Sequence, residues 1–541
     1  MSSVIFMKPT ELSTDTQELH KLIQKQYEKL QEFSRIIKSL ESLNKLKDEK
    51  IEYYRNQLYN KKSEKWTPDE QKQALLFNEA EQIVDEEKTI LVKEHRKKKK
   101  KRGKRDGLDP NLPREEVILD LEEHEKTCGC GCVLTPLPNP EVLEKLKIIP
   151  AQFVVVKTIR PQYVCKKCEG SGDENRPGVK SKPPLLQLIP KAILHRDSLA
   201  YMITQKYCDH LPINRISNIL KRSGVTISRA TIARNFITVS EKLESIANQI
   251  LQQVQFAHAV QIDETRLQVI NEPGRKGTNL SWMWCFRSGL VGEIESAVYF
   301  HYDQSRSAKF LKDFLFGYKG IIQTDGLGTY NAHLSSIVSE DEHAGCNVHA
   351  RRKFTDIYKS IKNNKSVNHI LEEYNRLYRL EESYYQLKIH HNKDKLEKRR
   401  QRHSLPIMER MKAFIASELS VMEPSGDLYK AMRYFISHYD KLIIFIYNGN
   451  ITPDTNLVEN AIRPFALGRK NWLFAFSPEG AKASAIYYAL IENAKLCGLD
   501  PYQYLKTVFD EIVENPNFDP KDLTPQAIAK KQKEESRTTT T

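Results

Sequence analysis

The chain has 541 residues, of which 40% are hydrophobic and 28% charged, the balance of a soluble protein with about three to five domains. Its 84 Lys and Arg residues exceed its 70 Asp and Glu residues, and the resulting formal charge of +14 favours a polyanionic partner such as nucleic acid. No apolar run approaches the roughly 18–20 residues of a membrane-spanning helix. The N-terminus also lacks the basic region of a secretory signal, so we expect a cytoplasmic protein with no membrane partner.

The first segment, residues 1–65, is predicted to be a leucine-zipper-like coiled coil. From Leu19 to Leu58, seam positions recur alternately four and three residues apart, over more than five heptads, and most are apolar. Asn44 falls at an a position, where a buried Asn favours a dimer. We therefore expect a homodimer or higher oligomer; a single amphipathic helix packed on its own chain is the alternative.

A polar linker over residues 66–110 follows, and it contains an intensely basic stretch. Arg96–Arg105 holds nine cations in ten residues, too polar to form a core. Such a stretch neutralises phosphates without regard to base sequence. A solvated tether that keeps the protein in solution is the alternative interpretation.

Five of the nine cysteines are clustered, whereas the other four are scattered, as reduced thiols of a cytosolic protein would be. The clustered residues are Cys128, Cys130, Cys132, Cys165 and Cys168. Two cysteines from each half would give a tetrahedral site for a structural Zn²⁺, with one of the first three left over. The β-branched run Phe153–Ile159 suits the hairpin of a zinc-ribbon-like domain over residues 111–185. A redox Cys-x-x-Cys is the alternative, but it does not explain the upstream cluster.

Residues 186–250 predict a helical segment with the form of a helix–turn–helix. Gly224 supplies the turn, and Ser228 can cap the second helix. Arg229 and Arg234 on that helix are candidate DNA contacts if it enters a major groove. A helical hairpin that braces the next domain fits the same pattern equally well.

From Phe256 the hydrophobic period becomes that of strands. Three strands are predicted, then a helix, a short buried strand, and a strand that leads into a basic helix. In chain order they lie at 256–270, 281–289, 295–305, 308–320, 321–333 and 344–360. This is the order of an RNase-H-like α/β domain, with residues 251–364 as its first part. In that order the ends of the first and fourth strands lie side by side, which brings Asp263 and Asp325 together.

Two adjacent carboxylates repel each other unless a cation lies between them, and hard oxygen ligands suit Mg²⁺ or Mn²⁺. A third carboxylate normally completes a two-metal site for in-line attack on a phosphodiester. Each aspartate alone has a simpler explanation. Asp325 precedes a glycine, which is a turn signal, and the Asp-Glu-Thr at Asp263 can cap a helix.

The third carboxylate follows a segment that looks inserted, because it is charged and helix-rich without strand alternation. We divide the rest of the chain into four parts. They are a helical insertion (365–447), a catalytic helix with a basic turn (448–482), a C-terminal element (483–518) and a disordered tail (519–541). Asp454 or Thr455 can cap a helix that places Glu459 one turn before Arg463, a spacing that also suits a simple ion pair. The basic turn that follows is close enough to hold DNA phosphates.

Sequence motifs are spread along nearly the whole chain. In order they are YNKKSEK, NLPREEV, IPAQFVVVKTIRPQYVCKKC, KYCDHLPINR, HAVQIDET, IIQTDGLGTY, HARRKF, NLVENAIRPFALGRKNWLF and ENAKLCGLDPYQYL. This series resembles the motifs of the IS66-type family of bacterial insertion-sequence transposases. The motifs are weak singly, but their joint occurrence in this order makes the resemblance specific.

The resemblance implies the Asp-Asp-Glu (DDE) chemistry of transposition, carried by Asp263, Asp325 and Glu459 as ligands of Mg²⁺ or Mn²⁺. We therefore expect a DDE transposase that cleaves DNA at the terminal inverted repeats of its element and joins the ends to target DNA. Besides the two arginines of the helix–turn–helix, the candidate DNA contacts are His349, Arg351, Arg352, Lys353, Arg463, Arg469 and Lys470.

The resemblance also implies partners and a location. Pairing two element ends calls for at least two protomers, which the coiled coil would supply. Relatives' elements usually encode two small companion proteins, which are further candidate partners, and the implied location is the nucleoid of a bacterial cytoplasm. The chain departs from the family pattern at Phe476, where a small residue, usually Gly, is typical.

Two rival functions fit part of these observations. A non-catalytic DNA-binding regulator derived from a transposase would keep the zinc domain, the basic arm and the zipper. An RNase-H-like nuclease without joining activity would keep the acidic residues.

Overall fold

The computed structural model describes residues 23–33, 37, 152–164, 179–289, 296–306, 310–325, 339, 342–361 and 364–538. The chain divides into a smaller unit, Glu87–Pro184, and a larger one that comprises Met1–Glu86 and Leu185–Thr541. The described part contains no helix that is long and apolar enough to cross a membrane. The five clustered cysteines and the basic stretch Arg96–Arg105 lie outside the described residues, so the zinc site and the basic arm stay predictions.

In the smaller unit, β1 (Gln162–Val164) pairs with β2 (Val179–Ser181) as a two-stranded antiparallel sheet. Arg160 fastens the pair, because its Nε donates a hydrogen bond of 2.9 Å to the carbonyl of Lys182. The strand expected at Phe153–Ile159 is wrong: the run precedes β1, carries no strand assignment and exposes its apolar side chains. A β-branched run becomes a strand only where it finds a partner and a face to bury.

Of the predicted coiled coil, the structure describes residues 23–33 and 37, which are helical. The seam residues among them are exposed: Ile23, Leu30, Phe33 and Ile37. An apolar seam exposed on a single chain is the surface that a coiled coil buries against a second copy. The oligomer itself stays a prediction.

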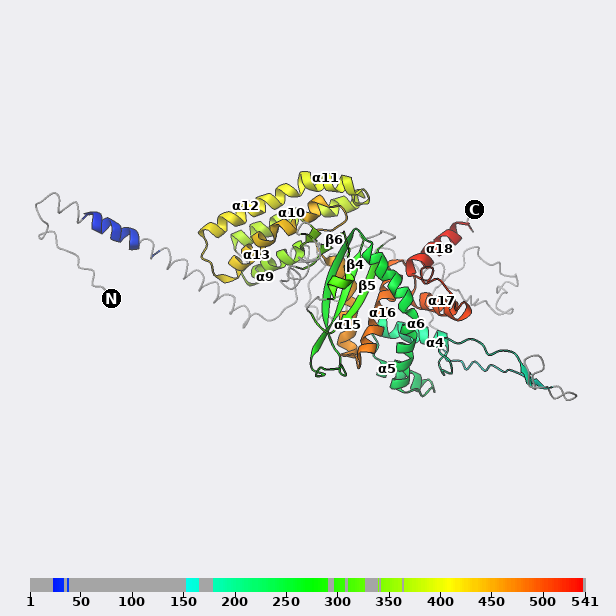
Figure 1. Cartoon of the computed structure of the whole chain (residues 1–541). Helices are drawn as coiled ribbons and strands as arrows, with labels where there is room; N and C mark the ends of the chain where they lie inside the picture. Colours follow the sequence, from blue (N-terminus) through cyan, green and yellow to red (C-terminus); the bar gives the residue numbers. More distant parts are fainter. Residues whose placement is uncertain are drawn as a thin grey trace, which may run out of the picture. The chain divides into compact units, whose positions relative to one another are not determined.

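The larger unit contains a five-stranded sheet in the order β5-β4-β3-β6-β7. Its strands are β3 (Ala259–Gln268), β4 (Leu280–Ser288), β5 (Ala297–Asp303), β6 (Ile321–Gln323) and β7 (His343–Ala344) (Figure 1). The first three form an antiparallel meander, and β6 and β7 run parallel to β3. Gln261 lies opposite Gln323 in the register, which confirms that the first and fourth strands are neighbours.

The helix expected at 308–320 is shorter in the structure. Of its described residues, Leu311–Phe314 form α7, and Gly317 adopts a φ of +74° in the turn that follows. A positive φ is accessible to Gly without steric cost and ends helices. After β7, α9 (Asn347–Ser360) carries the basic motif, as the sequence predicted.

Alternate side chains of the sheet point to opposite faces. On one face Phe286 stacks on Phe314, with ring centroids 4.1 Å apart. On the other, Phe300 packs against Tyr488 at 5.7 Å. Cross-strand pairing puts Asp263 in line with Phe300, so Asp263 points to this second face.

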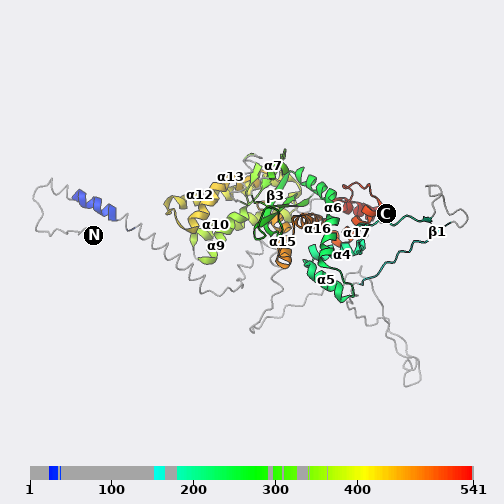
Figure 2. The same ribbon diagram turned by 60° about the horizontal axis from the view of Figure 1, so that its bottom comes forward.

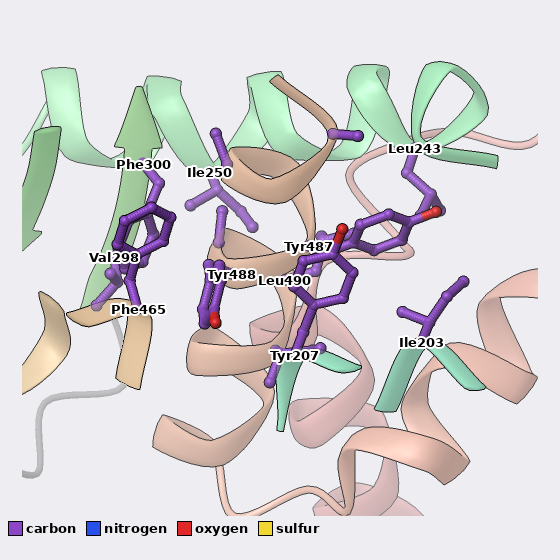
Figure 3. Close-up of a cluster of buried hydrophobic side chains, with 14 of the residues drawn as sticks. Ile203, Tyr207, Leu243, Ile250, Val298, Phe300, Phe465, Tyr487, Tyr488 and Leu490 are labelled. Carbon is purple, nitrogen blue, oxygen red and sulfur yellow. The ribbon is translucent and has the colours of Figure 1, made fainter. Parts of the chain in front are cut away.

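Several helices share one hydrophobic core with the sheet. Among them are α4 (Arg196–Tyr207), α5 (Ile213–Arg222), α6 (Arg229–Gln255), α15 (Asn456–Trp472), α16 (Pro478–Leu496) and α17 (Pro501–Glu514). Figure 3 shows part of this core: Tyr207 stacks on Tyr487, with centroids 4.8 Å apart, and Phe465 packs on Tyr488 at 5.2 Å. A Cβ on Gly468 would lie 2.5 Å from the Tyr488 hydroxyl, so only glycine lets α15 approach α16 this closely. This core fixes the position of α15.

The predicted helical hairpin is present, with Gly224 in the turn at φ +83° and Ser228 accepting a hydrogen bond from the amide of Thr231. The buried stripe of α6 packs against β5 and α16, so this helix braces the sheet. Arg229 and Arg234 are exposed at its start. The helix therefore has the bracing role, and the DNA contacts of Arg229 and Arg234 stay predictions.

The insertion between α9 and α15 is helical throughout its described residues, as predicted. It consists of α10 (Lys365–Gln386), a 3₁₀ turn η3 (Ile389–His391), α11 (Lys393–His403), α12 (Leu405–Val421), α13 (Gly426–Leu442) and α14 (Ile444–Tyr447). Figures 1 and 2 show α9, α10, α12 and α13 gathered into one bundle, which has its own hydrophobic core.

The disordered tail predicted from residue 519 is wrong over most of its length. Residues Pro525–Thr538 form α18, in which Ile528 and Ala529 are buried. The Gln526 side chain donates to the carbonyl of Ser296 beside β5, at 2.9 Å. The polar composition concealed a short apolar face that docks onto the sheet domain.

Candidate active site

The first candidate ligand, Asp263, lies in the middle of β3 with Gln261 and Thr265 on the same face. The Oδ1 atom of Asp263 accepts a hydrogen bond from the Glu264 amide at 2.9 Å. Glu264 points to the opposite face, where its Oε1 accepts two hydrogen bonds from Arg306, at 2.8 and 2.6 Å. The strand therefore separates two adjacent acids into one that faces α15 and one that pairs with an arginine.

The second candidate ligand, Asp325, follows the end of β6 by two residues. Its carbonyl accepts from the Thr324 hydroxyl at 2.9 Å, and that hydroxyl lies 2.8 Å from Nε2 of His343. Lys441 of α13 donates to the other ring nitrogen of His343 at 3.0 Å, so Nε2 carries the proton and donates to Thr324. Burial lowers the pKa of His343 to about 3, which keeps the ring neutral. A hydrogen-bond chain thus runs from the insertion to the Asp325 backbone.

Two buried glutamines connect the strands to the segment before α15. Nε2 of Gln261 lies 2.8 Å from Oε1 of Gln323 and 2.8 Å from the Asp454 carbonyl, and its Oε1 accepts from the Val458 amide at 3.1 Å. Gln323 in turn donates to the carbonyl of Thr452 at 2.8 Å. Each glutamine stands two residues before a candidate aspartate, so one network sets the positions of both strands and of the first turn of α15.

The third candidate ligand, Glu459, lies in that first turn. Thr455 occupies the N-cap position, but the first free amide of the helix, that of Asn456, donates to the Asp454 carboxylate at 3.0 Å. Both residues expected at the cap are therefore there, and Asp454 makes the hydrogen bond. The Thr455 hydroxyl lies 3.3 Å from Oε1 of Glu459.

The negative charges of Glu459 and Asp325 both act on Asp263, although the ligand atoms of these three carboxylates do not all lie within 4.8 Å of one another. The pKa of Asp263 is raised from 3.8 to about 8, first by burial and then by the negative charges of Glu264, Glu459 and Asp325. Like charges raise the pKa of a carboxyl because they disfavour its ionised form. A divalent cation would reverse this effect, and carboxylate oxygens are the donors that Mg²⁺ and Mn²⁺ take. The residues present therefore fit such an ion.

Two side chains of the basic motif lie beside Glu459. Nδ1 of His349 is 3.6 Å from Oε1 of Glu459, and a guanidinium nitrogen of Arg352 is 3.7 Å from Oε2. Burial lowers the pKa of His349. Arg352 keeps about half of its side chain exposed and can reach a ligand beside the carboxylates.

Other expected DNA contacts are differently placed. Arg351 turns into the insertion, where it donates to Oδ1 of Asn375 at 3.2 Å, and burial lowers its pKa to about 10. Lys353 is exposed over the ring of Tyr434. Arg469 donates to the Thr265 hydroxyl at 2.9 Å and to the Arg266 carbonyl. Arg463 is half-buried, whereas Lys470 is exposed.

Sequence reasoning missed three buried residues that support the site. They are Gln261, Gln323 and Cys346, the last of which accepts hydrogen bonds from the Thr455 amide and hydroxyl at 3.3 and 3.2 Å. A signal for the glutamines was present, because Gln-x-Asp occurs in both acid-bearing strands. Cys-x-x-His at the start of α9 was the corresponding signal for Cys346.

Phe476 does not distort the backbone, although a small residue was expected there. The positive φ in this turn belongs to Leu473, at +68°, and Phe476 is an exposed residue whose carbonyl accepts from the Asn271 amide at 2.9 Å. Its backbone bond needs no glycine.

Comparison with known proteins gives one consistent answer. The family model described as Transposase IS66 family matches residues 191–483, more than half of the chain. Models of the zinc-finger binding domain of transposase IS66, of Transposase C of IS166 homeodomain and of the IS66 C-terminal element match residues 125–169, 48–117 and 489–526. The zinc-finger match spans all five clustered cysteines.

Relatives in Sinorhizobium fredii agree. The uncharacterized protein y4jD is 30% identical over 413 residues, which cover 75% of this chain and 78% of y4jD. The uncharacterized protein y4qI is 29% identical over 420 residues, which cover 76% of this chain and 74% of y4qI. With the family match over the sheet and its acids, and 30% identity over three quarters of the chain, the protein belongs to the IS66 transposase family.

Proposed function

We propose that this protein is an active DDE transposase, which cleaves DNA at the ends of an insertion sequence and joins the freed ends to target DNA. The observation that supports this most is the pKa of Asp263, which is raised first by burial and then by the negative charges of Glu264, Glu459 and Asp325. Carboxylates that repel one another, on β3, after the end of β6 and on α15, are suited to binding divalent cations.

The proposal extends to the architecture. The strand order β5-β4-β3-β6-β7, with a parallel β3–β6 pair, supports an RNase-H-like catalytic domain interrupted by the α10–α14 insertion. For the parts outside the described residues, we propose a structural Zn²⁺ held by two of Cys128, Cys130 and Cys132 together with Cys165 and Cys168. We also propose a homo-oligomer through the N-terminal coiled coil.

Asp263, Asp325 and Glu459 would hold Mg²⁺ or Mn²⁺, which when bound activates a water molecule for cleavage and a 3′-hydroxyl for joining. In this scheme the carboxylates are ligands and do not relay protons. The protein side chains orient the DNA: Arg352, exposed beside Glu459, meets a phosphate, and Lys470 follows the backbone away from the site. Gln261 and Gln323 hold the ligands in register.

The test uses the purified full-length chain, Mg²⁺ and a duplex that carries one terminal inverted repeat of the element with flanking DNA. We expect cleavage at the repeat and joined products with a second DNA. Asp325→Asn should abolish both, while repeat binding in a mobility-shift assay persists. The matched control is Asp313→Asn, an exposed aspartate of α7, which should behave as the wild type.

Three outcomes distinguish the rival functions. Repeat binding without cleavage by the wild-type chain would favour a non-catalytic regulator. Cleavage without hydroxyl-dependent joined products would favour a nuclease. Cleavage by Asp325→Asn at the wild-type rate would overturn the assignment of the acids.

A further inference from the structure

A second set of metal-binding side chains lies at the start of α9. Cys346 is the N-cap residue of this helix and His349 lies in its first turn, three positions later and on the same face. Glu459 comes from the first turn of α15. One ligand atom from each, a sulfur, an imidazole nitrogen and a carboxylate oxygen, lies within 4.8 Å of the other two. Among the described residues, no other three such side chains meet in this way.

The separation of two of these ligand atoms is close to that in a tetrahedral site. Nδ1 of His349 and Oε1 of Glu459 are 3.6 Å apart. Two ligands bonded at about 2.0 Å to a tetrahedral ion lie roughly 3.3 Å apart. The Thr455 hydroxyl is 3.2 Å from the sulfur and 3.3 Å from the same carboxylate oxygen. The Cys346 sulfur and the Glu459 carboxylate oxygen therefore border the same small volume.

The imidazole nitrogen that faces this volume has no competing role. Nδ1 of His349 is buried and has no hydrogen-bond partner in the described part of the chain. A buried ring nitrogen without a partner is costly unless something occupies it.

The chemistry of the three donor atoms determines which metal ion the site would bind. Sulfur and imidazole nitrogen are poor ligands for Mg²⁺, which takes oxygen, but good ones for Zn²⁺ and Cd²⁺. Three protein ligands with water as the fourth make a four-coordinate zinc site. Glu459 would belong to both sites, whereas Cys346 and His349 would serve only the thiophilic one.

We propose that Cys346, His349 and Glu459 form a binding site for a thiophilic divalent cation such as Zn²⁺, and that an ion bound there withdraws Glu459 from Asp263 and Asp325. On binding, the sulfur–metal bond forms and the thiol proton passes to solvent. Binding itself is independent of the proposed transposase activity; only the inhibition that follows rests on it.

The binding test uses full-length protein without DNA. Wild type and Cys346→Ser are titrated with Cd²⁺. The number of Cd²⁺ ions bound per chain is determined, and the ultraviolet absorption from thiolate-to-cadmium charge transfer is measured. Both proteins keep the cysteines of the zinc-finger region, so only the difference between them matters. We expect the wild type to bind one more Cd²⁺ than Cys346→Ser, with a correspondingly stronger absorption band. The matched control, Cys497→Ser, replaces a half-buried thiol elsewhere and should retain the wild-type stoichiometry.

A second variant guards against a folding artefact. His349→Gln leaves the thiol in place and should weaken this one Cd²⁺ site at least tenfold, with an unchanged circular dichroism spectrum. Equal Cd²⁺ stoichiometry in the wild type and Cys346→Ser would overturn the site.

The inhibition is tested separately, with cleavage assayed at saturating Mg²⁺. Zn²⁺ should inhibit the wild type at concentrations at least tenfold lower than those needed for Cys346→Ser. Equal sensitivity of two active proteins would overturn the coupling through Glu459. Complete inactivity of the wild type without Zn²⁺ would instead count against the proposed function, and the Cd²⁺ result would stand by itself.

Discussion

The sheet domain and the helical insertion treat buried charge in opposite ways. In the insertion, Arg400 and Glu381 are both almost fully buried and form two parallel hydrogen bonds, of 3.0 and 2.7 Å. Another guanidinium nitrogen of Arg400 donates to the carbonyls of Phe445 and Ile451, at 2.8 and 3.0 Å. The Glu381 carboxylate therefore meets an opposite charge, and Arg400 meets both that charge and two carbonyl dipoles.

At the sheet, burial first and then the negative charges of nearby carboxylates raise the pKa of Asp263 to about 8. Its sequence neighbour Glu264 resembles the insertion, because it pairs with Arg306 across the other face of the sheet. A buried charge that is paired holds a fold together, whereas carboxylates that repel one another need a partner from outside the chain. The difference supports our proposal that the second face of β3 carries the functional site.

The largest effect should come from removing one of the repelling carboxylates. Glu459→Gln takes away a metal ligand, which costs about 5 kcal/mol of transition-state stabilisation, or roughly 10⁴-fold in cleavage rate. Because it also removes a repulsion, the variant should unfold in urea at or above the wild-type midpoint. A loss of activity that merely follows a loss of stability would contradict this expectation.

In the insertion, removing one partner of the buried ion pair should lower stability and leave activity nearly unchanged. Arg400→Met leaves the Glu381 carboxylate buried without its partner, which costs about 3–5 kcal/mol of unfolding free energy. The midpoint of unfolding in urea measures this loss of stability. Residual activity per folded molecule should stay near that of the wild type. A stability change below about 1 kcal/mol would show that the pair is not structural.

A smaller effect is expected at the junction of the two regions. Gln323→Met keeps the volume but leaves the Thr452 carbonyl without its donor, at a cost of about 1–3 kcal/mol. Since the network also positions Glu459, kcat should fall further than stability explains, with little change in KM for DNA. Gln526→Met on α18 is the matched control: it removes similar hydrogen bonds, to Ser296 and Asn493, and should affect stability alone.

The most gradual effect concerns pH in metal-free protein, because it is spread over several pH units. The folded-state pKa of Asp263, about 8, lies above its ordinary value of 3.8, so the folded state binds more protons between these pH values. Its contribution to stability is therefore complete below about pH 4 and is lost as pH rises toward 8. The melting temperature of the wild type should fall over this window more steeply than that of Asp263→Asn. Parallel curves would contradict the raised pKa.

The sequence was informative where periodicity and spacing act locally. It located the strand that carries Asp263, the helix that carries Glu459 and the helical nature of the insertion. It could not reveal contacts between distant residues, such as that of Gln323 with Thr452. Nor could it single out Arg400, one of four cations in LEKRRQRH, as the buried one. The docked face of α18 was missed for the same reason: burial depends on a partner that the local pattern does not contain.

The most direct test of the cation centre is Mn²⁺ binding, followed by electron paramagnetic resonance on full-length protein without DNA. Mn²⁺ prefers oxygen ligands, so the cysteines do not interfere. The wild type should bind one or two ions that Mg²⁺ displaces, and Asp325→Asn should lose at least one of them. Wild-type Mn²⁺ binding in Asp325→Asn would contradict the claim that these carboxylates converge to hold metal.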